Sequence, residues 1–189
     1  MTSRHADLPK RIALTDERRG GSPFEQLERL GPTDAIILRH YDTPSRARAD
    51  LAKKLRLASV SQGVRLLIAG DQRLAHHVKA DGLHLPRWLV KRGYDWRRRV
   101  QPGFVITAAA HNEAELIAAA QSGVDAALLS PVFPTASHPE ANALGPVKFA
   151  TLAGRVPIPV YALGGVTRTT VQRLAGVENR VGWAAVSGI

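Results

Sequence analysis

The sequence predicts an α/β fold, a compact (β/α)8 TIM barrel, with residues 1–189 as a single domain and residues 1–9 as its N-terminal tail. Short apolar runs alternate with stretches of helical periodicity along the whole chain, which is typical of βα units around a parallel sheet. Eight such runs can be counted, and eight parallel strands close most naturally into a barrel. The last run lies directly before the end of the sequence, so we expect the eighth helix to be missing. An open doubly wound sheet is the alternative fold.

The first half of the chain accounts for four strands, expected at residues 11–15, 35–38, 65–68 and 82–85. Ser22 and Pro23 indicate the start of the first helix, because serine followed by proline is a common helix beginning and Glu25 completes a capping box. Thr43 and Pro44 open the second helix. Helical spacing predicts the residues of its buried face: Ala47, Leu51, Leu55 and Ala58.

The second half of the chain supplies the other four strands, expected at residues 104–108, 126–129, 159–163 and 182–186. Asn112 is expected to cap the helix between the first two of these strands, with Glu115 as its partner in a capping box. Leu116, Ile117 and Ala120 should form the buried stripe of that helix.

The chain is strongly basic, since 26 Lys and Arg residues against 16 Asp and Glu residues leave a net charge of +10. Such a charge attracts anionic partners, either nucleic acid or a phosphorylated metabolite. Arginines cluster at positions 46 and 48 and at 97–99, and we expect solvated faces there because no nucleic-acid-binding module surrounds them. We therefore expect a small phosphorylated ligand and no nucleic-acid partner.

Composition also restricts the compartment and the chemistry. No apolar run approaches the roughly 20 residues that span a bilayer, and no apolar segment of signal-peptide length follows the N-terminus. The absence of cysteine excludes disulfides, thiolate catalysis and cysteine-based metal sites. We expect a cytoplasmic protein without a membrane partner.

Small and polar residues follow the last three predicted strands. In a barrel, function gathers at the carboxyl ends of the strands, and phosphate commonly binds at the last two. Hydroxyl groups and backbone N–H groups at these ends can converge on one anion. The predicted phosphate-binding residues are Thr135, Ala136, Ser137, Gly164, Gly165, Val186 and Ser187. In the alternative interpretation the two glycines only form a tight turn, and Thr135 and Ser137 only cap loop backbone.

These segments resemble the family of thiamine phosphate synthase and the related thiazole tautomerase (TenI). The match extends in collinear order over about residues 10–189. The segments that carry it are Leu66-Leu67-Ile68, Ala80-Asp81-Gly82-Leu83-His84-Leu85, Ala110-His111-Asn112, Pro131-Val132-Phe133-Pro134-Thr135, Leu163-Gly164-Gly165-Val166 and Val186-Ser187-Gly188-Ile189. The proline-rich segment together with the downstream glycine pair is fairly specific.

The resemblance implies two half-sites, which this sequence treats differently. The synthase joins a hydroxymethylpyrimidine diphosphate to a thiazole phosphate and expels diphosphate with the help of Mg²⁺. Its thiazole phosphate is held by a Thr-x-Thr loop, a Gly-Gly turn and a closing Val-Ser. This chain has Thr135-Ala136-Ser137, Gly164-Gly165 and Val186-Ser187 at these positions, so each hydroxyl or backbone donor is retained.

The half-site that holds Mg²⁺ and diphosphate in the family is largely replaced. Its Gln-Leu-Arg-x-Lys falls on residues 37–41, where only Arg39 remains. Its metal-binding Asn-Asp falls on Ala69 and Gly70, and its second aspartate falls on Leu89. The family's serine after the fifth strand is Ala109, and the lysine that closes the Thr-x-Thr loop is His138. Mg²⁺ requires hard oxygen ligands, so we expect no cofactor unless Asp71 substitutes for the missing ligands.

The resemblance leaves several functions open, and the sequence does not decide whether the protein is an enzyme. A tautomerase needs only the thiazole phosphate site and a proton carrier, but the family's histidine is replaced by Pro131. The candidate catalytic residues are His138, His84 and Arg39, with His40 as a further candidate proton carrier. The alternatives are a thiamine phosphate synthase with a rebuilt diphosphate site, and a non-catalytic protein that binds or senses the phosphorylated ligand. A homodimer could cover the groove beside the eighth strand.

Overall fold

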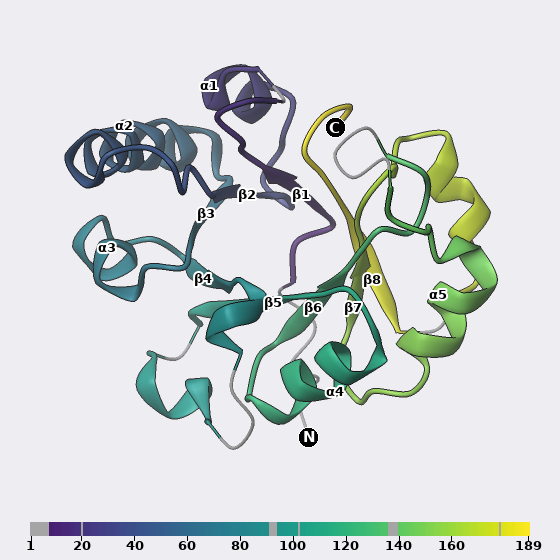
Figure 1. The fold of residues 1–189 in the computed structure, drawn as a ribbon. Helices are drawn as coiled ribbons and strands as arrows, with labels where there is room; N and C mark the ends of the chain where they lie inside the picture. The colour runs from purple at the N-terminus through teal and green to yellow at the C-terminus, as the bar shows by residue number, and fades with distance from the viewer. Residues whose placement is uncertain (1–7, 20, 91–93, 102, 136–139, 178) are drawn as a thin grey trace.

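The fold is a closed barrel of eight parallel strands in the order β1 to β8, with β8 paired to β1 (Figure 1). A computed structural model describes residues 8–19, 21–90, 94–101, 103–135, 140–177 and 179–189. Within these ranges the helices surround the strands. Closure confirms the predicted barrel and rules out the open doubly wound sheet.

The strands lie close to the predicted positions. Their bounds are β1 (Arg11–Leu14), β2 (Ala35–Leu38), β3 (Arg65–Ala69), β4 (Gly82–Leu85), β5 (Val105–Ala110), β6 (Ala126–Leu129), β7 (Val160–Ala162) and β8 (Arg180–Ala185). Two differences have a clear cause in strand pairing. β5 continues to Ala110 because Ala109 and Ala110 pair with β6, and β8 begins early because Arg180 pairs with Val160 of β7.

At least one helical element lies between each pair of consecutive strands. The helical elements are α1 (Pro23–Glu28), α2 (Ser45–Gln62), α3 (Gln72–His77), α4 (Glu113–Gln121) and α5 (Gly145–Ala153), with the short 3-10 helices η1 (Arg87–Leu89), η2 (Trp96–Arg99) and η3 (Thr170–Leu174). Within the described residues, no helix follows β8 before Ile189, as expected. Of the helices in these ranges, none has the length and apolar character that crossing a bilayer requires.

The helix caps agree in part with the sequence. Asn112 caps α4 as predicted, because its side-chain oxygen accepts from the N–H of Glu115 at 2.9 Å. The reciprocal contact differs, since the Glu115 carboxylate accepts from the N–H of His111. Ser22 caps α1 through the N–H of Phe24.

The buried face of α2 agrees with the prediction at Leu55, and the predicted Leu51 and Ala58 pack half-buried against the core, but the face also differs in one respect. Ala47 is exposed, and the buried residues are Arg48, Ala52, Leu55 and Ser59. Arg48 is buried because its guanidinium donates to the Arg39 carbonyl at 2.9 Å and the Ala69 carbonyl at 2.6 Å, at the ends of β2 and β3. The expectation of a solvated face was therefore wrong for Arg48. It was also wrong for Arg97, which contacts Asp125 and the carbonyl of Phe104.

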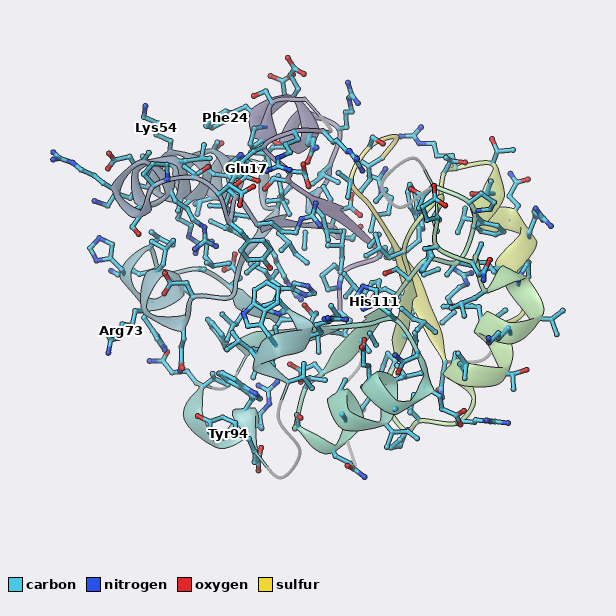
Figure 2. The ribbon with its side chains drawn as sticks, viewed as in Figure 1. Glu17, Phe24, Lys54, Arg73, Tyr94 and His111 are labelled. Atoms are coloured by element: carbon cyan, nitrogen blue, oxygen red, sulfur yellow. The ribbon has the colours of Figure 1, made fainter. Side chains whose placement is uncertain are left out.

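Two apolar layers position the strand ends. One fills the barrel interior, with Leu14, Ile37, Tyr161 and Ala184 among its members, and the other lies between the sheet and the helices. Side chains alternate between the two faces of a strand. Residues two positions after these interior members therefore face the mouth of the barrel: Asp16, Arg39, Leu163 and Val186. Exposed charged side chains such as Lys54 and Arg73 point outward from α2 and α3 (Figure 2).

Candidate functional site

The loop after β6 is joined to the glycine turn after β7. The N–H of Val132 donates to the Leu163 carbonyl, and the N–H of Phe133 donates to the Gly164 carbonyl, both at 2.9 Å. The turn needs glycine because φ is +83° at Gly164 and +64° at Gly165, a region that other residues rarely adopt. A Cβ on Gly165 would also lie only 2.4 Å from the Pro134 carbonyl oxygen. The two glycines thus form the tight turn of the alternative interpretation.

The peptide planes of this turn are fixed through their carbonyls. The Leu163 and Gly164 carbonyls accept the two bonds above, and the Gly165 carbonyl accepts from the Thr170 hydroxyl at 3.1 Å. In a trans peptide the C=O and the following N–H point in opposite directions. The N–H groups of Gly164, Gly165 and Val166 are therefore turned away from these donors. In the described part of the chain, no group accepts a hydrogen bond from any of the three.

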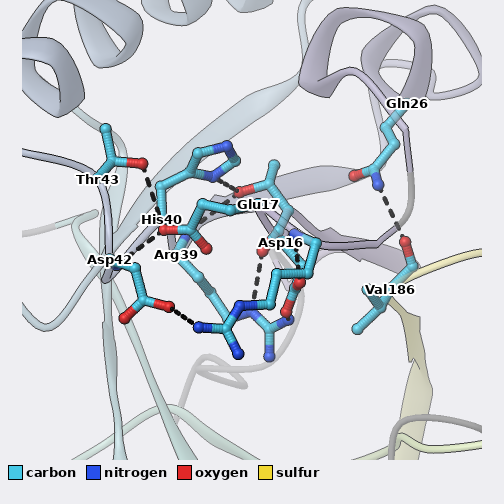
Figure 3. A network of polar contacts seen from close by, with 10 residues as sticks. Asp16, Glu17, Gln26, Arg39, His40, Asp42, Thr43 and Val186 are labelled. Atoms are coloured by element: carbon cyan, nitrogen blue, oxygen red, sulfur yellow. Dashed lines mark hydrogen bonds and ion pairs between the residues drawn. The ribbon is translucent and has the colours of Figure 1, made fainter.

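The end of β8 repeats this arrangement. The Val186 carbonyl accepts from the side-chain amide of Gln26 at 2.9 Å (Figure 3), so the N–H of Ser187 points away from α1. Ser187 is exposed, and among the described residues its N–H has no acceptor. Because β7 pairs with β8, the glycine turn and Ser187 follow adjacent strands.

The remaining predicted phosphate-binding residues, Thr135, Ala136 and Ser137, follow β6 in the sequence. Thr135 is half-buried and continues the segment that is joined to the glycine turn. Ala136, Ser137 and the candidate catalytic residue His138 lie outside the described residues.

Arg39 is engaged by the protein itself. Its Nε donates to the Thr15 carbonyl at 2.9 Å, and its Nη2 bonds to the carboxylate of Asp16 at 2.6 Å (Figure 3). Arg39, which the resemblance places in the diphosphate half-site, is therefore already paired with a carboxylate. Beside it, the Glu17 carboxylate accepts from the N–H of Asp42 at 2.9 Å. No sequence pattern pointed to Glu17, because its partners Asp42 and Thr43 come from the loop after β2.

His84 lies in the barrel interior, only 3% exposed. Its Nδ1 contacts the hydroxyl of Thr107, its register partner on β5, at 2.9 Å. Burial, and to a lesser extent the positive charge of Arg39, lowers the pKa of His84 to about 3. The imidazole is therefore neutral at pH 7, and its surroundings oppose protonation.

His40 has similar surroundings. It is 8% exposed and its Nδ1 contacts the Thr15 hydroxyl at 2.8 Å. Burial lowers the pKa of His40 as well, although the nearby Glu17 carboxylate acts in the opposite direction. Both histidines are integrated into the hydrogen bonding of the strand ends.

The residues at the expected metal-binding positions do not supply suitable ligands for Mg²⁺. Gly70 and Leu89 carry no side-chain oxygen, and Asp71 uses one oxygen to cap α3 through the N–H of Leu74 at 2.9 Å. Its other oxygen lies 3.7 Å from the Arg48 guanidinium. Within the described ranges, no group of three or more His, Asp or Glu residues could hold a metal ion. A pocket of about 490 Å³ opens here between α2 and α3, and Tyr41, Arg48 and Asp71 contribute to its lining.

Comparisons with known proteins agree on one family. The sequence pattern described as thiamine monophosphate synthase matches residues 14–189. A protein of Aquifex aeolicus (strain VF5) with the provisional name thiamine-phosphate synthase 2 is 36% identical over 164 residues, which cover 85% of this chain and 87% of the relative. The thiamine-phosphate synthase of Methanoculleus marisnigri is 32% identical, covering 93% of this chain and 86% of the relative.

Among solved structures, thiamine phosphate pyrophosphorylase from Pyrococcus furiosus has a similar fold. Its TM-score is 0.77 at 24% sequence identity, covering 95% of this chain and 86% of that one. At this level of identity the likeness concerns the barrel alone.

Proposed function

This chain belongs to the thiamine monophosphate synthase family, and on that premise we propose that it binds a thiazole phosphate or thiamine monophosphate, without Mg²⁺, at the ends of β7 and β8. The family places the protein in thiamine biosynthesis.

The observation that supports this proposal is the orientation of the peptide planes. The carbonyls of Leu163, Gly164, Gly165 and Val186 accept internal hydrogen bonds, and the N–H group that follows each carbonyl has no acceptor among the described residues. Backbone N–H groups gathered at strand ends bind phosphate oxygens without needing a charged side chain. The net charge of +10 favours the approach of such an anion.

The described residues do not favour a rebuilt diphosphate site. A departing diphosphate needs cations or a metal that stabilise its charge. Arg39 is bonded to Asp16, and Asp71 is shared between a helix cap and Arg48. We therefore rank the synthase reaction below ligand binding.

Whether the bound ligand undergoes proton transfer depends on His138. Of the three candidate catalytic residues, Arg39 is engaged in an ion pair and His84 is kept neutral in the core. His138 follows β6 in the sequence, outside the described residues, and remains the proposed proton carrier of a tautomerase-like reaction. The engagement of the other two also supports a second function, non-catalytic binding or sensing of the same ligand.

Calorimetry with thiazole phosphate, thiamine monophosphate and diphosphate, each with and without Mg²⁺, tests the proposal. We expect one of the two thiazole-containing phosphates to bind equally well in both conditions. Ser187→Asp should weaken binding by about a hundredfold, because like charges brought together cost several kcal/mol. Ser187→Ala keeps the backbone N–H and should have little effect.

Ser61→Asp is the matched control, because it adds the same charge at an exposed position of α2. Binding that Ser187→Asp leaves unchanged would exclude the proposed phosphate site, and Mg²⁺-dependent diphosphate binding would support the synthase instead. Turnover of the non-aromatic thiazole tautomer that is lost in His138→Ala but kept in His84→Gln would identify the proton carrier. Binding without turnover would favour the sensing function.

A further inference from the structure

Gln26 of α1 contacts a residue 160 positions later in the chain. Its Nε2 donates to the Val186 carbonyl at 2.9 Å (Figure 3), and the side chain is 3% exposed. Gln26 belongs to a helix of only six residues. Burying its polar side chain would lower the stability of the fold unless the side chain is hydrogen-bonded. This bond connects the first helix of the barrel to the segment that follows its last strand.

The segment after β8 has little else to hold its backbone in place. The last register pair between β8 and β1 is Ala185 with Ala13, so Val186 lies beyond the ladder. In the described part of the chain, the bond from Gln26 is the only hydrogen bond made by residues 186–189. The orientation of the Val186–Ser187 peptide therefore depends on Gln26.

We propose that Gln26 is a positioning residue for phosphate binding, acting through the N–H of Ser187. This inference rests on the proposed function. Because the C=O and N–H of one peptide point in opposite directions, a donor that holds the Val186 carbonyl toward α1 holds the Ser187 N–H away from it. The glycine turn after β7 is fixed by the same principle, through the carbonyls of Leu163 and Gly164. Gln26 thus does for the end of β8 what the loop after β6 does for the end of β7.

Two substitutions of Gln26 test this role. Gln26→Met keeps the size of the side chain and removes the donor. Gln26→Glu keeps the shape but places a carboxylate against the Val186 carbonyl. Loss of one hydrogen bond to a charged phosphate should weaken the binding of thiazole phosphate by about tenfold to a hundredfold. Binding of the dephosphorylated thiazole alcohol should change by less than about threefold, because it lacks the group that the Ser187 N–H contacts.

Tyr161→Phe is the matched control. The Tyr161 hydroxyl is buried and donates to the Pro9 carbonyl at 2.6 Å, next to the start of β1 and away from the mouth. This variant also loses a buried bond from a side chain to a backbone carbonyl. It should lower the free energy of unfolding and leave the affinity for thiazole phosphate unchanged.

The outcomes separate this inference from the proposed function. If the wild-type protein fails to bind thiazole phosphate, the proposed function fails and this inference fails with it. If the wild type binds thiazole phosphate and both Gln26 variants bind it with the affinity of the wild type, this inference alone is overturned. It is also overturned if the variants lose the phosphate and the alcohol to the same extent, or if Tyr161→Phe loses as much affinity. Should both variants fail to fold, titration of the ¹⁵N-labelled wild type with inorganic phosphate decides, because a Ser187 amide signal that does not move contradicts the role.

Discussion

His84 and His40 both contact threonine hydroxyls inside the protein, at 2.9 Å and 2.8 Å. From sequence alone, each was a candidate proton carrier near a strand end, where a structural role is the more common one for histidine. Burial distinguishes the two roles, because the charged imidazolium loses its hydration when it is moved into the core. An acid–base catalyst needs a pKa near the working pH, and His84 is far below it.

This depressed pKa predicts acid sensitivity. An unfolded histidine takes up a proton near pH 6.5, whereas folded His84 does so near pH 3, so stability should fall as pH decreases through this window. One such histidine changes the free energy of unfolding by up to about 1.4 kcal/mol per pH unit. Urea unfolding at pH 7, 6 and 5 should show the decline, with His40 adding to it.

His84→Gln should reduce the pH dependence of stability between pH 6.5 and 5, and the exposed His77→Gln should retain it. The lowered pKa values of Glu17 and Glu115 act only below their ordinary value of 4.5, so this window isolates the histidines. An unchanged slope in His84→Gln would contradict the assigned burial effect.

At the scale of the element, α2 shows where helical periodicity fails as a guide. Spacing of apolar residues predicted Leu55 correctly on the buried face, but it also placed Ala47 there, which is exposed, and it missed Arg48, which is buried. The guanidinium satisfies backbone carbonyls at the ends of β2 and β3, which a short apolar side chain cannot do. Apolar spacing carries no information about this need, because the carbonyls belong to two other elements.

Arg48→Met should therefore destabilise the protein although it replaces a charged residue with an apolar one. It leaves the Arg39 and Ala69 carbonyls without their donor, and we expect a loss of about 2–4 kcal/mol in the free energy of unfolding. Denaturant titration measures this loss. Arg46→Met, at an exposed position of the same helix, should stay within about 0.5 kcal/mol of wild type. Equal effects of the two substitutions would mean that the carbonyl contacts contribute nothing to stability.

At the scale of the whole molecule, stability depends on closing the barrel between its first and last strands. β1 and β8 meet at a close approach, because a Cβ on Gly182 would lie 2.2 Å from the Lys10 carbonyl oxygen and 3.0 Å from the Tyr161 ring. Local sequence patterns were sufficient to predict the eight strands. The requirement for glycine at this position follows only from the packing of residues that lie far apart in the chain.

Gly182→Ala should destabilise the whole barrel, by about 3 kcal/mol, because the methyl group would force the backbone of β8 away from the chain before β1. Gly31→Ala is the control, since the nearest atom to its Cβ is 3.9 Å away. Thermal unfolding followed by circular dichroism compares the two. If the Gly182→Ala variant is as stable as Gly31→Ala, the close approach of Gly182 to the Lys10 carbonyl does not require glycine.

The sequence by itself determined the barrel, the approximate limits of all eight strands and the glycine turn after β7, because each of these is encoded by spacing or residue type within a short window. Tertiary structure alone decided which polar groups are already engaged. Arg39 meets Asp16 across 23 positions, and Gln26 meets Val186 across 160. Such partners come together only when the barrel closes, so no local pattern records that the Arg39 cation is paired or that the Ser187 N–H is turned away from α1.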